Sequence, residues 1–504
     1  VFKEKPIEWE TITDNNSLYR VSMPGHAEDL KIFGIMVMKV NMDIFKGNAY
    51  FTTAVTTPIP SGKIDSAMDA MSLQMFPGNH TKSMPIHQSG ASGREYSTNA
   101  DGIYRKGYIL YRNHKLFVAM AASSHESSEA ISDITRFLTS FTLTNETEES
   151  AVNPYRFRDS VQAYELAIPG KPQYMSELSG VREKDGVLSR IYTSIDNNQG
   201  VYYFFGTNTL LPGRYIDNDS TYLVALANSL KNKFEVFSRD SIYTKNNTRI
   251  LEIAGPVKGN NLLRMITRYH LRDNRWYAQV AVLSREKPDS EIMPFFNSFQ
   301  FLDFPKTMWS LHTSVDSLIT AWTPAPLTNL PNDFKAEKVD QLYDATDSIQ
   351  AHSYDIVAWH FNDYFWANSD SAFWADRIAS KLSPTDSLVY KKPVLNGDTP
   401  GWEFEKLAKG SHNYERYRLL RYGNQMYSIL STLPVSATDT RNINHFFESV
   451  RFRKPAPASR LLESHAGILL ADLFAQDSST AANALGFMDT APFSKNDLDT
   501  LQNT

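Results

Sequence analysis

A block of about 150 residues recurs three times along this chain of 504 residues, and the repeat limits the folds that the chain can adopt. Its clearest marker is a pair of aromatic-rich segments joined by a short polar turn. The three copies read GYILYRNHKLFVAMAAS at residues 107–123, MITRYHLRDNRWYAQVAVLS at 265–284 and YERYRLLRYGNQMYSILSTLP at 414–434. Their turns are Asn113-His114, Asp273-Asn274 and Gly423-Asn424. Because Asn, Asp and Gly tolerate a positive φ, each pair of segments is predicted to form a β-hairpin.

Other markers repeat in the same order on both sides of the hairpin. Each copy ends in a short helix and a strand, which read RFLTSFTL at 136–143, PFFNSFQF at 294–301 and HFFESVRF at 445–452. Each copy begins with a segment that ends at a proline turn: YRVSMPG at 19–25, YELAIPG at 164–170 and LITAWTPAP at 318–326. The matching positions Phe141, Phe299 and Val450 are 158 and 151 residues apart. This constant order indicates three copies of one unit, in the second of which Pro294 is expected to shorten the final helix.

Strands and a longer helix are expected between these markers. The strands are predicted at residues 31–40, 49–57, 188–195, 201–208 and 351–361, and the helices are predicted to begin at the caps Ser61, Ser220 and Ser369. Runs of strands interrupted by two helices favour antiparallel sheets with helices on their faces. We therefore predict an α+β protein with three tandem α/β/α sandwich units, mostly antiparallel sheets and a C-terminal α-helical segment. The units are placed at residues 1–150, 151–306 and 307–455, and the helical segment at 456–504.

The segment YRVSMPG and the phenylalanine-rich ending at residues 136–143 resemble the corresponding parts of the PsbP/Mog1-type α/β/α sandwich. The resemblance extends over the three units to residue 455, and the third unit has Pro324-Ala325 where the first two have Pro-Gly. It implies the fold of each unit and no functional residues. Domains of this family are commonly non-enzymatic accessory or binding modules, so the resemblance implies such a role here.

Apolar residues recur at helical spacing after Pro455. They predict helices at Ser459–Ala475 and Ser479–Phe487, and a third helix that begins near Pro492. Paired helices of this kind are typical of α-solenoid repeats, which need neighbours to bury their apolar faces. We expect that the chain is part of a longer protein and that residues 456–504 begin a helical-repeat region.

The composition excludes several classes of protein and bears on the cellular location. The formal net charge of −5 is too close to zero for a nucleic-acid-binding protein, and no apolar run reaches the ~18 to 20 residues of a membrane helix. The absence of cysteine removes disulfides, thiolate zinc sites and cysteine nucleophiles, and it suits an oxidising compartment. The chain begins at Val1, so either a signal peptide was removed or the sequence was trimmed. Because its content of Asn, Ser, Thr and Tyr is typical of exported bacterial proteins, we expect a periplasmic or extracellular protein whose signal peptide was removed. A cytoplasmic location stays open.

Motifs for common chemistries are missing or incomplete. Neither phosphate-binding glycine motif is present, and Arg94 stands where the last glycine of a nucleophile elbow belongs. The pair Glu403 and Glu405 could share a strand face and serve acid and base roles, but such pairs are common on solvated strands. The sequence therefore predicts no catalytic residues, no metal site and no cofactor.

The aromatic residues of the third unit form the one candidate binding region. Six of the 8 Trp residues lie there, and the connection between a strand and the longer helix reads AWHFNDYFWANSDSAFW at residues 358–374. Flat rings beside Asn and Asp can hold a sugar or a peptide by stacking and hydrogen bonding. The candidate ligand-binding residues are Asn362, Asp363, Tyr364 and Trp366, and the hypothesis requires that the two rings are exposed together. The alternative is that these aromatic residues fill a core or a domain contact.

Three functions remain open on this basis. The first is a non-catalytic exported scaffold or interaction protein whose partner is another protein or a cell-envelope component, because repeated modules multiply weak contacts. The second is a carbohydrate- or peptide-binding module centred on the third unit. The third is a hydrolase with a site between units, which requires a cleft with mutually hydrogen-bonded ionisable groups and perturbed pKa values.

Overall fold

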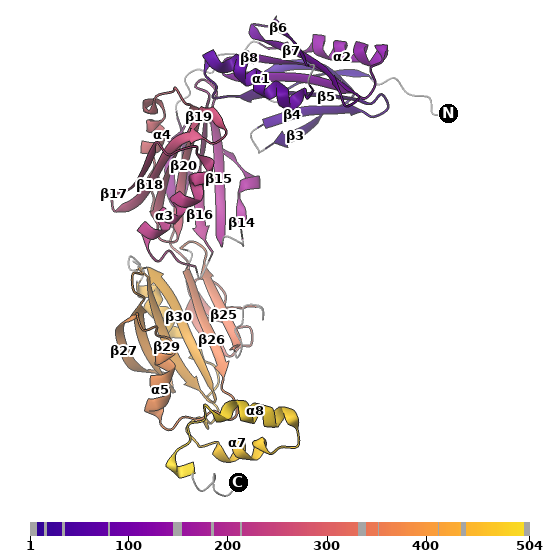
Figure 1. Cartoon of the computed structure of the whole chain (residues 1–504). Helices are drawn as coiled ribbons and strands as arrows, with labels where there is room; N and C mark the ends of the chain where they lie inside the picture. The colour runs from indigo at the N-terminus through magenta and orange to yellow at the C-terminus, as the bar shows by residue number, and fades with distance from the viewer. Residues whose placement is uncertain are drawn as a thin grey trace. The chain divides into compact units, whose positions relative to one another are not determined.

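A computed structural model describes residues 8–14, 18–32, 36–78, 81–144, 154–182, 186–211, 214–330, 339–350, 352–411, 413–434 and 440–497 (Figure 1). Its strands form mostly antiparallel sheets, and helices follow at the C-terminal end. The chain divides into two compact units, Val1–Thr209 with Leu223–Asp303, and Leu210–Tyr222 with Phe304–Thr504. The predicted boundaries at residues 150, 306 and 455 stay predictions.

The first part of the chain forms a three-stranded and a seven-stranded sheet. The small sheet has the order β1 (Trp9–Thr13), β2 (Tyr19–Pro24) and β10 (Thr142–Leu143). The large sheet has the order β3 (Glu28–Ile32), β4 (Met36–Asp43), β5 (Asn48–Thr56), β9 (Lys115–Ser123), β8 (Ile103–Arg112), β7 (Ala91–Ala100) and β6 (Lys82–Gln88). The helices of this part are α1 (Ile64–Met75) and α2 (Ser128–Ser140).

The middle part of the chain also forms one small and one large sheet. The small sheet has the order β11 (Tyr155–Asp159), β12 (Tyr164–Ile168) and β21 (Gln300–Phe301). The large sheet has the order β13 (Gln173–Tyr174), β15 (Val187–Asp196), β16 (Val201–Leu210), β20 (Arg275–Ser284), β19 (Asn260–Arg272), β18 (Thr248–Val257) and β17 (Arg239–Lys245), and β14 (Gly180–Arg182) also pairs with β15. The helices are α3 (Asp219–Leu230) and α4 (Met293–Asn297).

The last part follows the same order of strands and ends in two further helices. The small sheet is β22 (Ser310–Thr313), β23 (Ile319–Thr323) and β31 (Arg451–Phe452). The large sheet is β24 (Thr328–Asn329), β25 (Val339–Asp347), β26 (His352–His360), β30 (Gln425–Pro434), β29 (Asn413–Tyr422), β28 (Thr399–Leu407) and β27 (Ser387–Asn396). The helices are α5 (Asp370–Ala379), α6 (Thr440–Ser449), α7 (Ala466–Leu473) and α8 (Ser478–Met488).

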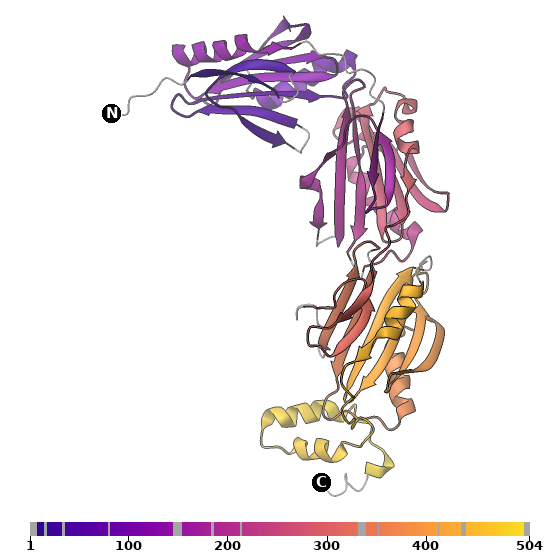
Figure 2. The same ribbon diagram turned by 180° about the vertical axis from the view of Figure 1, so that it is seen from behind.

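Helices cover both faces of the large sheets (Figures 1 and 2). In the first sheet Met68 of α1 packs with Ile109, whereas Phe137 of α2 packs with Leu110 on the opposite face. Successive side chains of a strand point to opposite faces, so two neighbours in sequence belong to two different cores.

The sheet of the last part is covered in the same way. Trp374 of α5 packs in one cluster with Leu419, and Phe446 of α6 packs in another cluster with Leu420. The small sheet contributes to the second cluster through Ile319 on β23.

The predicted hairpin turns have the expected backbone geometry. Asn113 and His114 have φ angles of 50° and 59°, Asp273 has 50° and Gly423 has 62°. The strands β15, β16 and β26 lie within a few residues of their predicted positions. Pro294 lies at the beginning of α4, which has only 5 residues, as predicted.

Two of the three predicted serine caps are wrong. Ser369 Oγ accepts the Ala372 N–H at 3.1 Å and caps α5. Ser61 instead begins a short 3-10 helix that precedes α1. Asn218, rather than Ser220, accepts the Thr221 N–H at 2.9 Å and caps α3, because its side-chain oxygen lies three residues before that amide.

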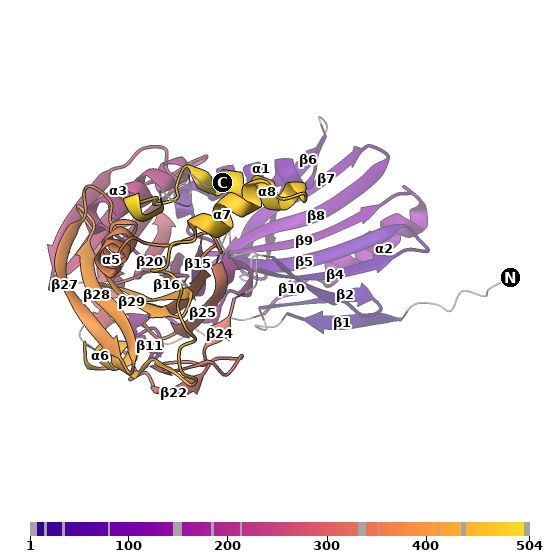
Figure 3. The same ribbon diagram turned by 90° about the horizontal axis from the view of Figure 1, so that it is seen from below.

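The C-terminal helices are shorter than predicted. The expected helix Ser459–Ala475 is reduced to α7, because Leu461 inserts into the cluster beside α5 and its carbonyl accepts the Ala367 N–H at 2.8 Å. The helix α8 agrees with the second prediction, and the two helices lie side by side (Figures 1 and 3). The predicted third helix is a 3-10 turn at Lys495–Asp497 within the described residues, and residues 498–504 lie outside them. No helix of the described part is long and apolar enough to cross a membrane.

A buried ion pair joins the last large sheet to α6. Glu403 is 0% exposed and accepts the Arg418 Nε–H at 2.7 Å and an Arg416 N–H at 2.9 Å. Arg418 also donates to the Phe447 carbonyl of α6. Burial raises the pKa of Glu403, but Arg416 and Arg418 outweigh burial and hold the pKa below its ordinary value. The charge is therefore retained in the interior because several donors surround it.

We expect Arg418→Met to destabilise the last part of the chain by about 3 kcal/mol, because Glu403 would remain buried with fewer partners. Denaturant unfolding followed by tryptophan fluorescence measures this loss. The double variant Glu403→Leu/Arg418→Met should be less destabilised than the sum of its single variants. Lys392→Met is the matched control, because its side chain is exposed and its contact with Glu403 at 3.4 Å should contribute less than about 1 kcal/mol.

Candidate functional site

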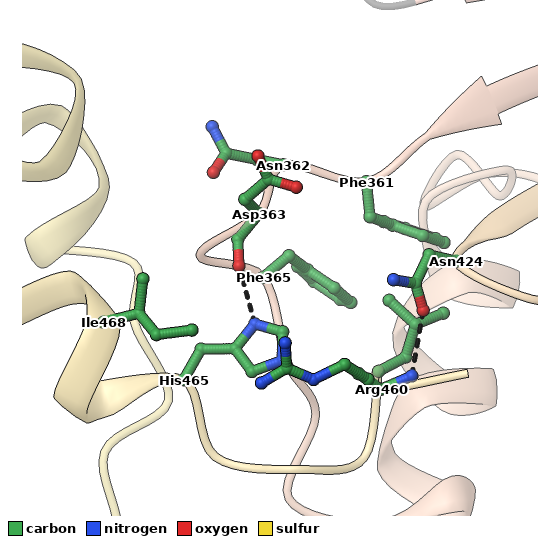
Figure 4. Close-up of a pocket in the computed structure, with 9 residues that line it drawn as sticks. Phe361, Asn362, Asp363, Phe365, Asn424, Arg460, His465 and Ile468 are labelled. Atoms are coloured by element: carbon green, nitrogen blue, oxygen red, sulfur yellow. Dashed lines mark hydrogen bonds between the residues drawn. The ribbon is translucent and has the colours of Figure 1, made fainter. Parts of the chain in front are cut away.

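The connection between β26 and α5 lies against the C-terminal helices and forms one wall of a small pocket. The pocket has a volume of about 200 Å³ (Figure 4). Its lining comes from three stretches of the chain: Phe361, Asn362, Asp363 and Phe365 from the connection, Asn424 from the turn between β29 and β30, and Arg460, Leu461, His465 and Ile468 from the C-terminal segment.

Local hydrogen bonds hold the connection in shape. The Asn362 side chain accepts the Tyr364 N–H at 2.8 Å, and its carbonyl accepts the Phe365 N–H at 2.8 Å. This is a turn of the kind that Asn commonly stabilises. The rings of Phe361 and Phe365 stack with centroids 4.6 Å apart, so the apolar part of the wall is also fixed.

His465 joins the C-terminal segment to this connection. Its Nδ1 lies 2.7 Å from the Asp363 carbonyl oxygen, which can only accept, so Nδ1 carries the proton and donates. In the neutral ring Nε2 is then an acceptor. His465 is 5% exposed, and Nε2 has no hydrogen-bond partner among the residues that the structure describes.

The residues of the connection face in two different directions. Asn362 and Asp363 are exposed and line the pocket, whereas Tyr364 and Trp366 are 7% and 2% exposed. The two rings pack with Ala466, Leu469 and Ala484 of α7 and α8.

The buried rings are held by specific contacts. Tyr364 Oη donates to Asp472 Oδ2 at 2.9 Å, and the Trp366 ring lies 5.6 Å from the Phe493 ring. The predicted exposure of Tyr364 and Trp366 as a stacking platform is therefore wrong, because the C-terminal helices cover both rings. Asn362 and Asp363 come together with residues about 60 and 100 positions away, which no spacing in the sequence indicated.

We expect Trp366→Ala to destabilise the packing of α7 and α8 by about 3 to 5 kcal/mol, because the ring is buried in their cluster. Amide hydrogen exchange should become faster in α7 and α8 while it stays unchanged in β28 and β29. Phe474→Ala, at a residue that is 75% exposed, should leave the exchange of both helices unchanged. Equal exchange in the two variants would contradict the assignment of Trp366 to this core.

A second group of ionisable side chains lies on β25 and β26. Asp344 and Asp355 face each other, and Ser353 Oγ lies 2.7 Å from Asp344 Oδ1 and 2.9 Å from Asp355 Oδ1. The Ser353 hydroxyl lies within donating distance of both carboxyl groups, so the two acidic side chains share one donor. Burial and then the charge of Asp344 raise the pKa of Asp355 to about 8.

The raised pKa of Asp355 has a consequence for stability. The protonated carboxyl stabilises the folded protein below its ordinary pKa of about 4, and this contribution is lost as the pH rises through about 8. Asp355→Asn retains a donor without the charge, so its melting temperature should fall less than that of the unchanged protein over this interval. Thermal unfolding at a series of pH values measures the difference. Asp398→Asn, at an exposed turn, should follow the unchanged protein, and identical slopes for all three proteins would contradict the raised pKa of Asp355.

Of the predicted acid and base pair Glu403 and Glu405, the structure places Glu403 in a buried ion pair. Glu403 is buried and engaged by Arg416 and Arg418, so it is not available as a base. Within the described ranges, no group of three or more His, Cys, Asp or Glu side chains could hold a metal ion.

Comparisons with known proteins give no family. No family model matches the chain, and no curated protein matches it. The immunity protein TplEi of T6SS from Pseudomonas aeruginosa is 10% identical, covers 59% of this chain and 98% of its own, and has a TM-score of 0.17. The matching chain of the Tle4–Tli4 complex is 11% identical, covers 59% of this chain and 100% of its own, and has a TM-score of 0.17. A thioesterase II from Thermobifida fusca is 9% identical, covers 49% of this chain and 97% of its own, and has a TM-score of 0.14. These TM-scores are too low to support an argument about fold or function.

Proposed function

We propose that this chain is a non-catalytic, exported interaction protein whose partner is another protein. We further propose that it contains three tandem copies of one PsbP/Mog1-type unit. The single observation that carries the binding role is an apolar turn between β4 and β5, where Ile44 is 84% exposed and Phe45 is 85% exposed.

The proposed copies have matching features in their large sheets. The strand order is the same in the three sheets when β14 is left aside. In the middle sheet Glu252 faces Arg268 at 2.9 Å, and Arg268 donates to the Phe296 carbonyl of the adjacent helix at 3.0 Å. Glu403 and Arg418 make the same set of bonds in the last sheet. Copying of one unit explains why an unusual buried pair lies at the same register in two sheets.

The apolar turn is held by polar contacts at its base. Asp43 is 4% exposed and accepts the Lys46 N–H at 3.2 Å. Lys46 Nζ contacts Glu129 at 2.8 Å and Asp133 at 3.0 Å on α2. Because both sides of the turn are tied to neighbouring elements, its shape is set before any partner binds. A preformed projection loses little conformational entropy on binding.

The exposed side chains have the chemistry of a protein contact. Large apolar and aromatic residues dominate the energetics of protein interfaces when they enter a pocket of the partner. Two adjacent ones with more than four fifths of their surface exposed cost solubility and are unusual without such a role. The acidic side chains of Glu129 and Asp133 at the base favour a partner with a basic rim over an anionic lipid surface.

The test compares the unchanged chain of 504 residues with its variant Ile44→Ser/Phe45→Ser, each immobilised as a bait in a cell-envelope extract of the source cells. A protein retained by the unchanged chain should be lost from the variant. With that protein purified, its affinity for the variant should be at least about 30-fold weaker, because a buried aromatic anchor contributes about 2 kcal/mol or more.

Leu485→Ser is the matched control, because Leu485 is 66% exposed on α8 and lies outside the turn. It should retain the same protein with unchanged affinity. Equal retention by the turn variant and the control would refute the proposed role of the turn. The proposal would also be overturned if the unchanged chain bound phosphatidylglycerol vesicles and retained no protein, and if the turn variant lost this vesicle binding. The turn would then contact lipid.

A further inference from the structure

One edge strand of each large sheet differs from the other two at a single matched position. The three strands are β6, β17 and β27, and each forms a hairpin with its neighbour through a two-residue turn. Three residues before the end of the strand, β6 has Pro85 and β27 has Pro393, whereas β17 has Ile242. Figure 1 shows β17 at the margin of the middle part of the chain.

The register of the hairpin determines which backbone groups of β17 face away from the sheet. Lys245 pairs with Thr248 across the turn, and residues that flank a two-residue turn bond to each other. Counted back from Lys245, every second residue therefore bonds to β18. The residues between them direct their N–H and C=O groups outward: Asp240, Ile242 and Thr244. Among the residues that the structure describes, no strand pairs with this side of β17.

In the first and last sheets a proline faces the corresponding edge. By the same count from the turn, Pro85 and Pro393 face outward, and a proline has no N–H to donate to an added strand. Outward prolines are a common protection of edge strands against pairing with another chain. Ile242 retains its N–H, so β17 keeps an uninterrupted row of donors and acceptors.

Side-chain contacts hold β17 in place. Arg239 at its beginning contacts Glu252 at 2.5 Å and Asp289 at 2.9 Å. Tyr243 Oη donates to Glu252 Oε2 at 3.3 Å. Because the edge is already ordered, it loses little conformational entropy when a strand is added.

Two exposed charges on β17 indicate the chemistry of the added strand. Asp240 and Lys245 have no ion pair within the described ranges. An antiparallel second copy of β17 centred on Ile242 would place Arg239 opposite Lys245, and like charges directly opposite each other are destabilising. The edge therefore favours a different chain, with an acidic side chain opposite Lys245 and a basic one opposite Asp240.

We infer that an extended segment of a partner protein adds to β17 as a further antiparallel strand of the middle sheet. Backbone hydrogen bonds to Asp240, Ile242 and Thr244 give affinity, and the charges of Asp240 and Lys245 set the direction and register of the segment. This surface is separate from the apolar turn at residues 44 and 45, and the inference does not depend on that turn.

The test uses the chain of 504 residues and an acetylated, amidated peptide with the sequence TEVTVTKT. With its second valine opposite Ile242, its glutamate lies opposite Lys245 and its lysine opposite Asp240. Binding is followed by isothermal titration calorimetry and by the backbone amide resonance of Ile242 in the ¹⁵N-isoleucine-labelled chain. The peptide should bind and shift this resonance, because the Ile242 N–H gains an acceptor.

Modified peptides test the hydrogen bonds without changing the protein. N-methyl groups on both valines remove N–H groups that face β17, so this peptide should bind at least about 10-fold more weakly, which corresponds to about 1.4 kcal/mol. N-methyl groups on the two threonines beside the second valine remove N–H groups that face away, and this matched peptide should retain most of the affinity. The charge-exchanged peptide TKVTVTET should bind at least about 3-fold more weakly than the original.

A variant of the protein tests the same contact from the other side. Ile242→Pro should weaken binding of the unmodified peptide at least about 10-fold, because it removes the central donor. The prolines at the matched positions of β6 and β27 indicate that the hairpin accommodates this substitution. Ile242→Val is the matched control, since it keeps the N–H and a β-branched side chain, and its affinity should be unchanged.

Three results would overturn the inference: no binding of the unmodified peptide up to about 5 mM, equal binding of the two N-methylated peptides, or equal binding by Ile242→Pro and Ile242→Val. A dimer of the chain that sedimentation velocity detects, and that Ile242→Pro abolishes, would also overturn it, since a second copy would then occupy the edge. Ile44→Ser/Phe45→Ser should bind the peptide as the unchanged chain does, so failure of this inference leaves the proposed role of the apolar turn unaffected.

Discussion

The fold depends on large sheets that are buried on both faces. A strand can fill two separate cores only if its apolar side chains do not alternate with polar ones, and neighbours such as Leu419 and Leu420 meet that requirement. Helices must then cover each face, which explains why α5 and α6 pack on opposite sides of one sheet. The buried pair of Glu403 and Arg418 adds a directional contact to the apolar packing, because Arg418 reaches a carbonyl of α6. Apolar burial stabilises the layers, and the ion pair adds a hydrogen bond between the sheet and the Phe447 carbonyl of α6.

The hairpins and long strands could be predicted from sequence because their signals are local. Asn113 and Asp273 adopt the positive φ that their turns require, and Pro294 limits α4. The caps of α1 and α3 could not be predicted in this way, because several polar residues near each helix start can serve as the cap. The helix predicted from Ser459 fails for a different reason. Its apolar spacing is helical, but Leu461 is taken up by a core formed elsewhere in the chain, and tertiary packing overrides propensity.

The candidate site could also be predicted only in part, because its shape depends on tertiary packing. Sequence composition drew attention to residues 362–366, because aromatic and amide side chains are dense there. It could not indicate that α7 and α8 cover two of the rings, since that requires knowing which surface the C-terminal segment packs against. His465 and Arg460 also carry no signal in sequence. They line the pocket because Asn424 holds the Arg460 backbone and the Asp363 carbonyl holds His465.

Burial of the aromatic pair and formation of the pocket are consequences of one contact. Tyr364 and Trp366 pack against α7 and α8, whereas Asp363 and Phe365, which precede and separate them, line the pocket. The same packing brings His465 to the Asp363 carbonyl, and this hydrogen bond fixes the ring. In this covered arrangement the polar groups at the contact are paired, since Tyr364 Oη donates to Asp472 and the Asp363 carbonyl accepts from His465.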